Sequence, residues 1–180
     1  LELMSWNSGS QPPKSEHISE PRKGYVRFIQ NRDYSDDSHI TYIPESRRNR
    51  LCTEMDIMVD KYGSAGQTRF GIAGAYNVAL SRIDVNGGSM REFIRSYLSS
   101  GDVKRYLSGS SVASTRASLS ADNLSFLNVA VPPGNILAEY EGLAQAHIRR
   151  MILLKKSSRR LEKLRDRLIP LLMSGKAYIK

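Results

Sequence analysis

Arg47, Arg48 and Arg50 stand close together in one polar segment of the chain. A guanidinium group can form two hydrogen bonds at once with a phosphate or with the edge of a guanine base. Arg22 and Lys23 add two cations just before an apolar segment. These five residues predict contacts with a nucleic acid, although a solvated loop accounts for them equally well.

A second group of hydrogen-bond donors surrounds a predicted turn that contains Gly63 and Gly66. Closely spaced glycines favour a tight turn, and a polar loop of this kind suits a DNA groove. A third polar segment, residues 108–120, has small side chains and a single basic charge, and solvent exposure alone is the simpler explanation for it. The candidate DNA-binding residues of these two segments are Lys61, Gln67, Thr68, Arg69, Thr115 and Arg116.

No arrangement of residues predicts a catalytic or metal centre. The sequence lacks a glycine-rich phosphate loop and paired cysteines, and its three histidines are far apart. Asp56 and Asp60, followed by Lys61, are the nearest approach to a metal-dependent nuclease site, but charges at the ends of a strand are the simpler interpretation. We therefore expect a binding protein that has no cofactor and no metal.

The chain has 180 residues, and its 27 Lys and Arg against 18 Asp and Glu give a net charge of +9. A basic protein favours an acidic partner, most often a nucleic acid. The excess is uneven, because residues 1–134 have 16 basic and 14 acidic side chains, whereas residues 135–180 have 11 and 4. No run approaches the ~20 apolar residues of a membrane span, and only one cysteine is present, so we expect a cytoplasmic protein without membrane contact.

Residues 1–134 have the pattern of a mixed domain made mainly of strands. Alternating or compact apolar runs predict strands at residues 25–29, 39–43, 56–60, 68–72, 76–83 and 124–131. Residues 90–107 instead have apolar side chains at helical spacing, and the Ser99-Ser100-Gly101 segment is expected to divide them into two helices. We expect this domain to end at the Pro132-Pro133-Gly134 segment.

Residues 135–180 contain one long amphipathic helix of about 35 residues, which would be roughly 50 Å long. The first region is too small to cover it, so we expect the helix to project and to pair with another helix as a coiled coil. Pro170 is expected to end or kink it. The expected fold class is therefore α+β. The predicted helix-pairing residues are Leu137, Tyr140, Ala144, Ile148, Met151, Leu154, Leu161, Leu164 and Leu168.

Five short motifs follow one another along the chain. Ser5 to Pro12 is similar to a Ser-Gly-x-Pro start, and Gly24 to Asp33 to a segment of a glycine, apolar residues and an aspartate. Asp56 to Gly66 matches an Asp-Ile-Leu-Val strand and glycine turn, and residues 119–133 match a closing strand. Leu164 to Gly175 is similar to a helix end of the type R-x-x-L-(L/I)-P-x-L-x-S-G. In this order, the motifs resemble those of the DNA-specificity subunit of type I restriction–modification systems.

The resemblance implies that residues 1–134 are a target-recognition domain for one half of a split double-stranded DNA site. It implies that the long helix is a spacer that docks the methyltransferase and restriction subunits, which carry out the catalysis. The usual subunit has two recognition domains and two long helices, whereas this chain has one of each. Two copies paired as a homodimer would restore both. Residues 135–140 also lack the glutamine-containing helix start that is usual in the family.

One alternative from a different class remains open. The paired basic residues of the helix, such as Lys155-Lys156 and Arg159-Arg160, are also typical of the polar face of any amphipathic helix. The chain would then be a coiled-coil interaction or adaptor protein that does not bind DNA.

Overall fold

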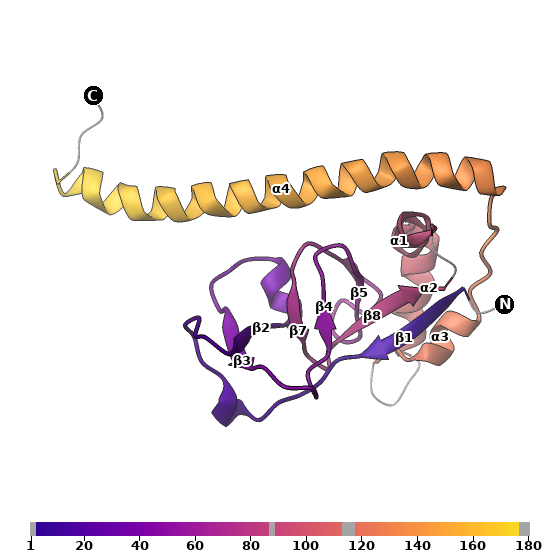
Figure 1. Cartoon of the computed structure of the whole chain (residues 1–180), viewed down its shortest axis with the longest axis horizontal. Helices are drawn as coiled ribbons and strands as arrows, with labels where there is room; N and C mark the ends of the chain where they lie inside the picture. Colours follow the sequence, from indigo (N-terminus) through magenta and orange to yellow (C-terminus); the bar gives the residue numbers. More distant parts are fainter. Residues whose placement is uncertain (1–2, 87–88, 113–117, 177–180) are drawn as a thin grey trace.

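The computed structural model describes residues 3–86, 89–112 and 118–176 (Figure 1). Two small sheets and the helices α1 to α3 form one body, and a long helix, α4, runs along one side of it (Figure 1). This arrangement confirms the predicted α+β class. No helix within these residues has the length and hydropathy needed to cross a membrane.

The first sheet has the strand order β1-β8-β5-β6, and all its pairs are antiparallel. Its central strand β5 is buried along its whole length, as expected for a compact apolar run. Ile57 and Val59 face one cluster of apolar side chains, and Met58 faces another. The strands are β1 (Met4–Ser8), β5 (Ile57–Asp60), β6 (Thr68–Arg69) and β8 (Leu80–Val85).

The second sheet has the order β3-β2-β7-β4, with β2 and β7 parallel and the other pairs antiparallel. Gly74 allows β7 to approach β2, because a Cβ atom at this position would lie 2.4 Å from the carbonyl oxygen of Arg27. The predicted strand at residues 76–83 is in fact divided, since a turn at Asn77 separates β7 from β8. The strands are β2 (Tyr25–Ile29), β3 (Thr41–Pro44), β4 (Leu51–Cys52) and β7 (Gly74–Tyr76).

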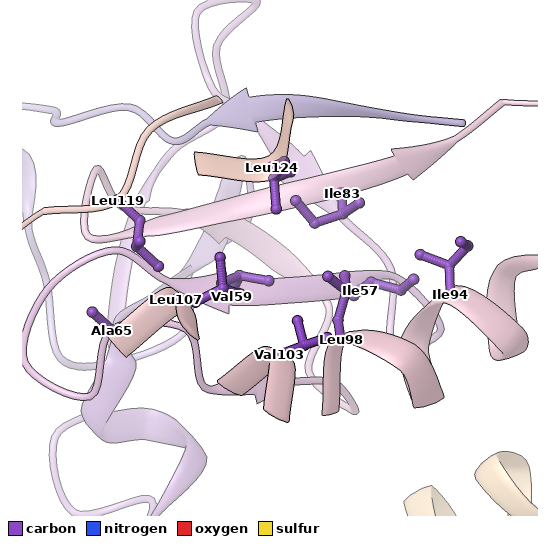
Figure 2. Packing of buried hydrophobic residues seen from close by; sticks show 10 residues of the cluster. All are labelled: Ile57, Val59, Ala65, Ile83, Ile94, Leu98, Val103, Leu107, Leu119 and Leu124. Carbon is purple, nitrogen blue, oxygen red and sulfur yellow. The ribbon is translucent and has the colours of Figure 1, made fainter. Parts of the chain in front are cut away.

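Helices α1 (Arg91–Ser99) and α2 (Gly101–Val112) pack against β5 and β8, and Figure 2 shows their apolar side chains meeting those of the sheet. They are separated at Ser100, as the sequence predicted. The strand predicted at residues 124–131 is wrong. Residues Ala121–Ser125 form a short helix, α3, which begins at a capping box between Ser120 and Asn123.

Helix α4 (Gly134–Met173) has 40 residues and is about 60 Å long. It begins one residue before the predicted start, and its C-terminal end extends beyond the domain (Figure 1). Pro170 does not end the helix as predicted, since α4 continues to Met173. The proline lies in the exposed last part of the helix. The helix was also expected to project from the domain, whereas one of its faces packs against the domain.

Candidate nucleic-acid interface

The structure brings two of the predicted basic segments together at one end of the second sheet. Strand pairing places Tyr25 opposite Pro44, and the backbone N–H of Glu45 donates to the carbonyl oxygen of Gly24 at 2.8 Å. The segment before β2 and the β3–β4 loop are therefore neighbours. We call their five cations the basic rim: Arg22, Lys23, Arg47, Arg48 and Arg50.

The β3–β4 loop has an ordered backbone but free arginine side chains. The Asn49 side chain donates to the carbonyl oxygen of Pro44 at 2.8 Å, and the carbonyl of Arg50 accepts from Tyr76 at 3.0 Å. All five basic-rim residues are exposed. Within the described part of the chain, no hydrogen bond or ion pair engages the guanidinium groups of the three loop arginines. They are therefore available for an anion such as a DNA phosphate.

The residues predicted around the glycine turn lie elsewhere, next to the first sheet. Lys61 is half-buried, and its Nζ lies 3.3 Å from the hydroxyl of Ser8 at the end of β1. Burial lowers the pKa of Lys61. The amide of Gln67 donates to the carbonyl oxygen of Thr68 at 3.2 Å. Within the described part of the chain, no hydrogen bond or ion pair joins this group to the basic rim.

Arg69 has a structural partner that the sequence did not reveal. Its Nη2 lies 2.9 Å from Oδ2 of Asp60, a residue of β5 whose side chain is 1% exposed. Burial raises the pKa of Asp60, and the hydrogen bond and charge of Arg69 oppose this rise. Arg69 therefore has a structural role, because its guanidinium group pairs with a buried carboxylate, and its contact with DNA stays a prediction.

Removing the Arg69 side chain is expected to destabilise the fold. Breaking a buried ion pair from one side typically costs about 3 kcal/mol, and the partial exposure of Arg69 reduces this to about 2 kcal/mol. Urea denaturation of R69A measures the loss, and R69A/D60N should regain part of it because no buried charge remains unpaired. An R69A protein as stable as the parent that no longer binds DNA would contradict this role.

Two further groups of residues were considered from the sequence: a polar segment with Thr115 and Arg116, and the aspartates Asp56 and Asp60. Thr115 and Arg116 lie outside the described residues. Asp56 accepts a hydrogen bond from the backbone of Thr53 at 2.7 Å, while Asp60 pairs with Arg69. Among the described residues, no three side chains of the types that bind metals gather in one place.

Basic residues of α4 hold the helix against the domain through a group that we call the Asp37 clasp. Arg159 and Lys163 lie 2.9 and 3.4 Å from the carboxylate oxygens of Asp37, and Arg27 of β2 lies 3.1 Å from it. Burial alone would raise the pKa of Asp37, but the hydrogen bond from Arg27 and the three positive charges outweigh it, so the pKa is lowered. The carboxylate therefore stays ionised at neutral pH and keeps the clasp closed.

Further contacts fix α4 on either side of its midpoint. Ile152 is 5% exposed and faces Gly71, and Lys155 lies 4.4 Å from the ring centre of Phe70. Lys156 also pairs with Glu54 at 2.6 Å. Sequence reasoning missed these contacts, although the spacing of 152, 156, 159 and 163 places them on one face of a helix.

The first part of α4 is attached to α1. The carboxylate of Glu141 accepts a hydrogen bond from the backbone N–H of Phe93 at 2.7 Å, which satisfies one of the free donors at the start of α1. The Tyr140 hydroxyl lies 2.6 Å from that of Ser96, and the Phe93 and Tyr140 rings meet edge to face. This region and the Asp37 clasp together define the back face of α4.

The opposite side of α4, which we call the front face, has no partner among the described residues. Of the nine predicted pairing residues, Leu137 is buried within the single chain, and Ala144 and Ile148 are half-buried beside α1. Leu137 is thus already covered within its own chain, and its role in helix pairing stays a prediction. Five of the others are well exposed, with exposed fractions of 39% to 63%: Met151, Leu154, Leu161, Leu164 and Leu168.

The fold has counterparts among solved structures, although its sequence does not match any family model or curated protein. An HsdS subunit from Thermoanaerobacter tengcongensis superposes with a TM-score of 0.60 at 15% identity over 88% of this chain. The chain has the fold of an HsdS subunit. A chain from a structure of the type I R-M system, reported for its assembly and conformational transition, gives a TM-score of 0.60 at 16% identity over 93%.

The similarity to the HsdS fold includes both parts of the chain, because the unmatched portion is shorter than either α4 or the domain. The chain covers 38% and 41% of the two matched chains, so it spans less than half of their length. One domain and one long helix are thus arranged as in part of an HsdS subunit.

Proposed function

We propose that this protein is a DNA-specificity subunit of a type I restriction–modification system and that its domain recognises one half of a bipartite target. The observation that carries the proposal is the match to the HsdS fold across both the domain and α4. The basic rim supports it, because three free guanidinium groups on one ordered loop suit a phosphate backbone.

In this proposal the basic rim positions the domain on the duplex, and sequence discrimination requires further contacts with base edges in a groove. The protein carries out no catalysis itself. Methyltransferase and restriction subunits dock on it and supply the chemistry. Lys61, Gln67, Thr68 and Arg69 stay as proposed DNA contacts, and Arg69 also pairs with Asp60.

A second copy of the chain is proposed as the partner of the front face of α4. Exposed leucines on one side of a 40-residue helix cost free energy in water, and pairing with an equivalent helix removes them from solvent. A two-fold dimer would present two recognition domains and would bind an inverted repeat.

Salt dependence distinguishes this function from a coiled-coil adaptor that does not bind DNA. Binding of a labelled duplex should weaken steeply between 50 and 200 mM salt, with a log–log slope of about −0.9 for each phosphate neutralised. Three to five basic-rim contacts therefore predict a slope between about −3 and −4.5. Fluorescence anisotropy measures it, and the absence of binding at low salt would favour the adaptor.

A further inference from the structure

A cavity of about 380 Å³ lies between the C-terminal half of α4 and the domain. Part of its wall is the segment 71–73, where Gly71 and Ala73 leave space because they carry little or no side chain. Long charged side chains from the domain and from α4 form most of the remaining wall. Five of them are cations, one from β2 and four from α4: Arg27, Lys156, Arg159, Arg160 and Lys163.

The cavity carries more positive charge than its own carboxylates neutralise. Lys156 pairs with Glu54 at 2.6 Å, but the three cations of the Asp37 clasp share a single carboxylate. Arg160 forms no ion pair with any described residue. The five cations therefore face two carboxylates, which leaves an excess of three positive charges around one cavity. Like charges at such short range repel one another, so a further anion would lower the electrostatic energy of the cavity.

The same cations have hydrogen-bond donors that the carboxylates do not use. Nη2 of Arg27 lies 3.1 Å from Asp37, but its Nε is buried and has no hydrogen-bond partner among the described residues. A buried donor without a partner costs free energy, which an anion can recover. The side chains of Lys156 and Lys163 are 53% and 65% exposed, so their ammonium groups can turn toward a ligand that enters from solvent.

From this charge and these donors, we propose that the cavity binds a phosphate group. A guanidinium group matches two phosphate oxygens at once, and three of the five cations are arginines. A metal cation does not fit, because both carboxylates of the cavity already pair with cations. The inference is independent of the proposed function, since the phosphate group can belong to a free ion or to a DNA strand.

The bound phosphate would join the two parts of the chain. Arg27 belongs to β2 of the domain, whereas the other four cations belong to α4, so the complete site exists only while α4 packs against the domain. A ligand that binds only the assembled form stabilises that form in proportion to the logarithm of its concentration. Phosphate binding therefore predicts a more stable docked helix.

Thermal unfolding of the full chain with inorganic phosphate tests this site. Phosphate is added at constant ionic strength by replacing sodium chloride, so that general screening of charges does not change. For a dissociation constant of about 1 mM, about 10 mM phosphate should raise the Tm by about 3 °C, and the rise should level off logarithmically. A Tm that is the same in phosphate and in chloride would overturn the proposal.

A charge reversal at Arg160 locates the effect in the cavity. Arg160 is exposed and takes no part in the Asp37 clasp, so R160E should fold normally while it removes one cation and adds a carboxylate. Phosphate affinity by calorimetry should fall at least about tenfold. R149E is the matched control, because Arg149 is an exposed residue of α4 about 16 Å away that does not line the cavity. Equal losses in R160E and R149E would overturn the assignment.

Binding of a labelled duplex to the same two variants distinguishes the sources of the phosphate group. If it belongs to a DNA strand, R160E should weaken duplex binding more than R149E does and should reduce the salt slope by about 0.9. If it is a free ion, the two variants should bind the duplex equally, and only R160E should lose phosphate affinity. A chain that binds phosphate in this way but binds no DNA would contradict the proposed function and leave the phosphate site intact.

Discussion

Replacing Arg47, Arg48 and Arg50 together with alanine is expected to weaken DNA binding by about 100-fold at low salt. The three guanidinium groups are exposed and have no hydrogen-bond or ion-pair partner among the described residues, so each can form a charge-assisted hydrogen bond with phosphate. The variant should also reduce the salt slope by about 2.7, because three fewer phosphates are neutralised. Anisotropy with a labelled duplex, in the presence of the methyltransferase partner, measures both quantities.

The control removes exposed cations from another part of the same domain. Lys104 and Arg105 lie on α2, where both are exposed and Arg105 pairs with Asp102. K104A/R105A should leave DNA affinity within about twofold, because the cost is that of surface charges far from the site. Unchanged affinity in the triple variant, or equal losses in both variants, would show that the basic rim is not the contact surface.

Replacing Leu161 with aspartate is expected to convert the proposed dimer to a monomer. The carboxylate would lie among the exposed leucines of the front face, and burying a charge without a partner costs several kcal/mol on each of the two chains. Dimerisation should therefore weaken by more than about 1,000-fold. Light scattering at micromolar concentration measures the change, and R149D places the same carboxylate at an exposed position that is not among the predicted pairing residues as a control.

Loss of the dimer should also weaken binding to a two-part DNA site, because the two domains would no longer act together. Binding to a duplex that holds a single half-site should stay nearly unchanged, since the domain itself is intact. If L161D remains dimeric, or if R149D dissociates to the same extent, the front face is not the pairing surface.

Local patterns predicted much of the fold. The run at residues 25–29 is a strand as expected, and the two helices within residues 90–107 separate at Ser100, just before Gly101. The segment 124–131 was predicted as a strand from its apolar residues alone. A capping box at Ser120 instead begins the short helix α3, and Leu124 reaches the core from this helix. Periodicity over so few residues does not distinguish the two.

The positions of the charges were harder to predict than the elements. The sequence indicates that Arg69, Arg159 and Lys163 are basic, but their carboxylate partners come from distant parts of the chain. Asp60 and Asp37 become partners only when the sheets and α4 pack together. The basic rim was predictable because its cations lie in short segments whose strands are neighbours in the sheet.

The net charge of +9 now has a more specific physical interpretation. Much of the excess lies on α4, where Lys156, Arg159 and Lys163 pair with carboxylates of the domain. These charges therefore contribute to holding the helix in place. DNA binding is expected to depend on a few free cations of the nearly neutral domain, and overall charge is a poor measure of it.

Selection of bound duplexes from a random-sequence library tests the central claim most directly. The full chain, together with its proposed methyltransferase partner, is incubated with the library at low salt, and the bound DNA is sequenced. A homodimeric specificity subunit predicts enrichment of an inverted repeat whose two halves are separated by a constant gap. A folded, dimeric chain that enriches no sequence would contradict the claim that this protein recognises DNA targets.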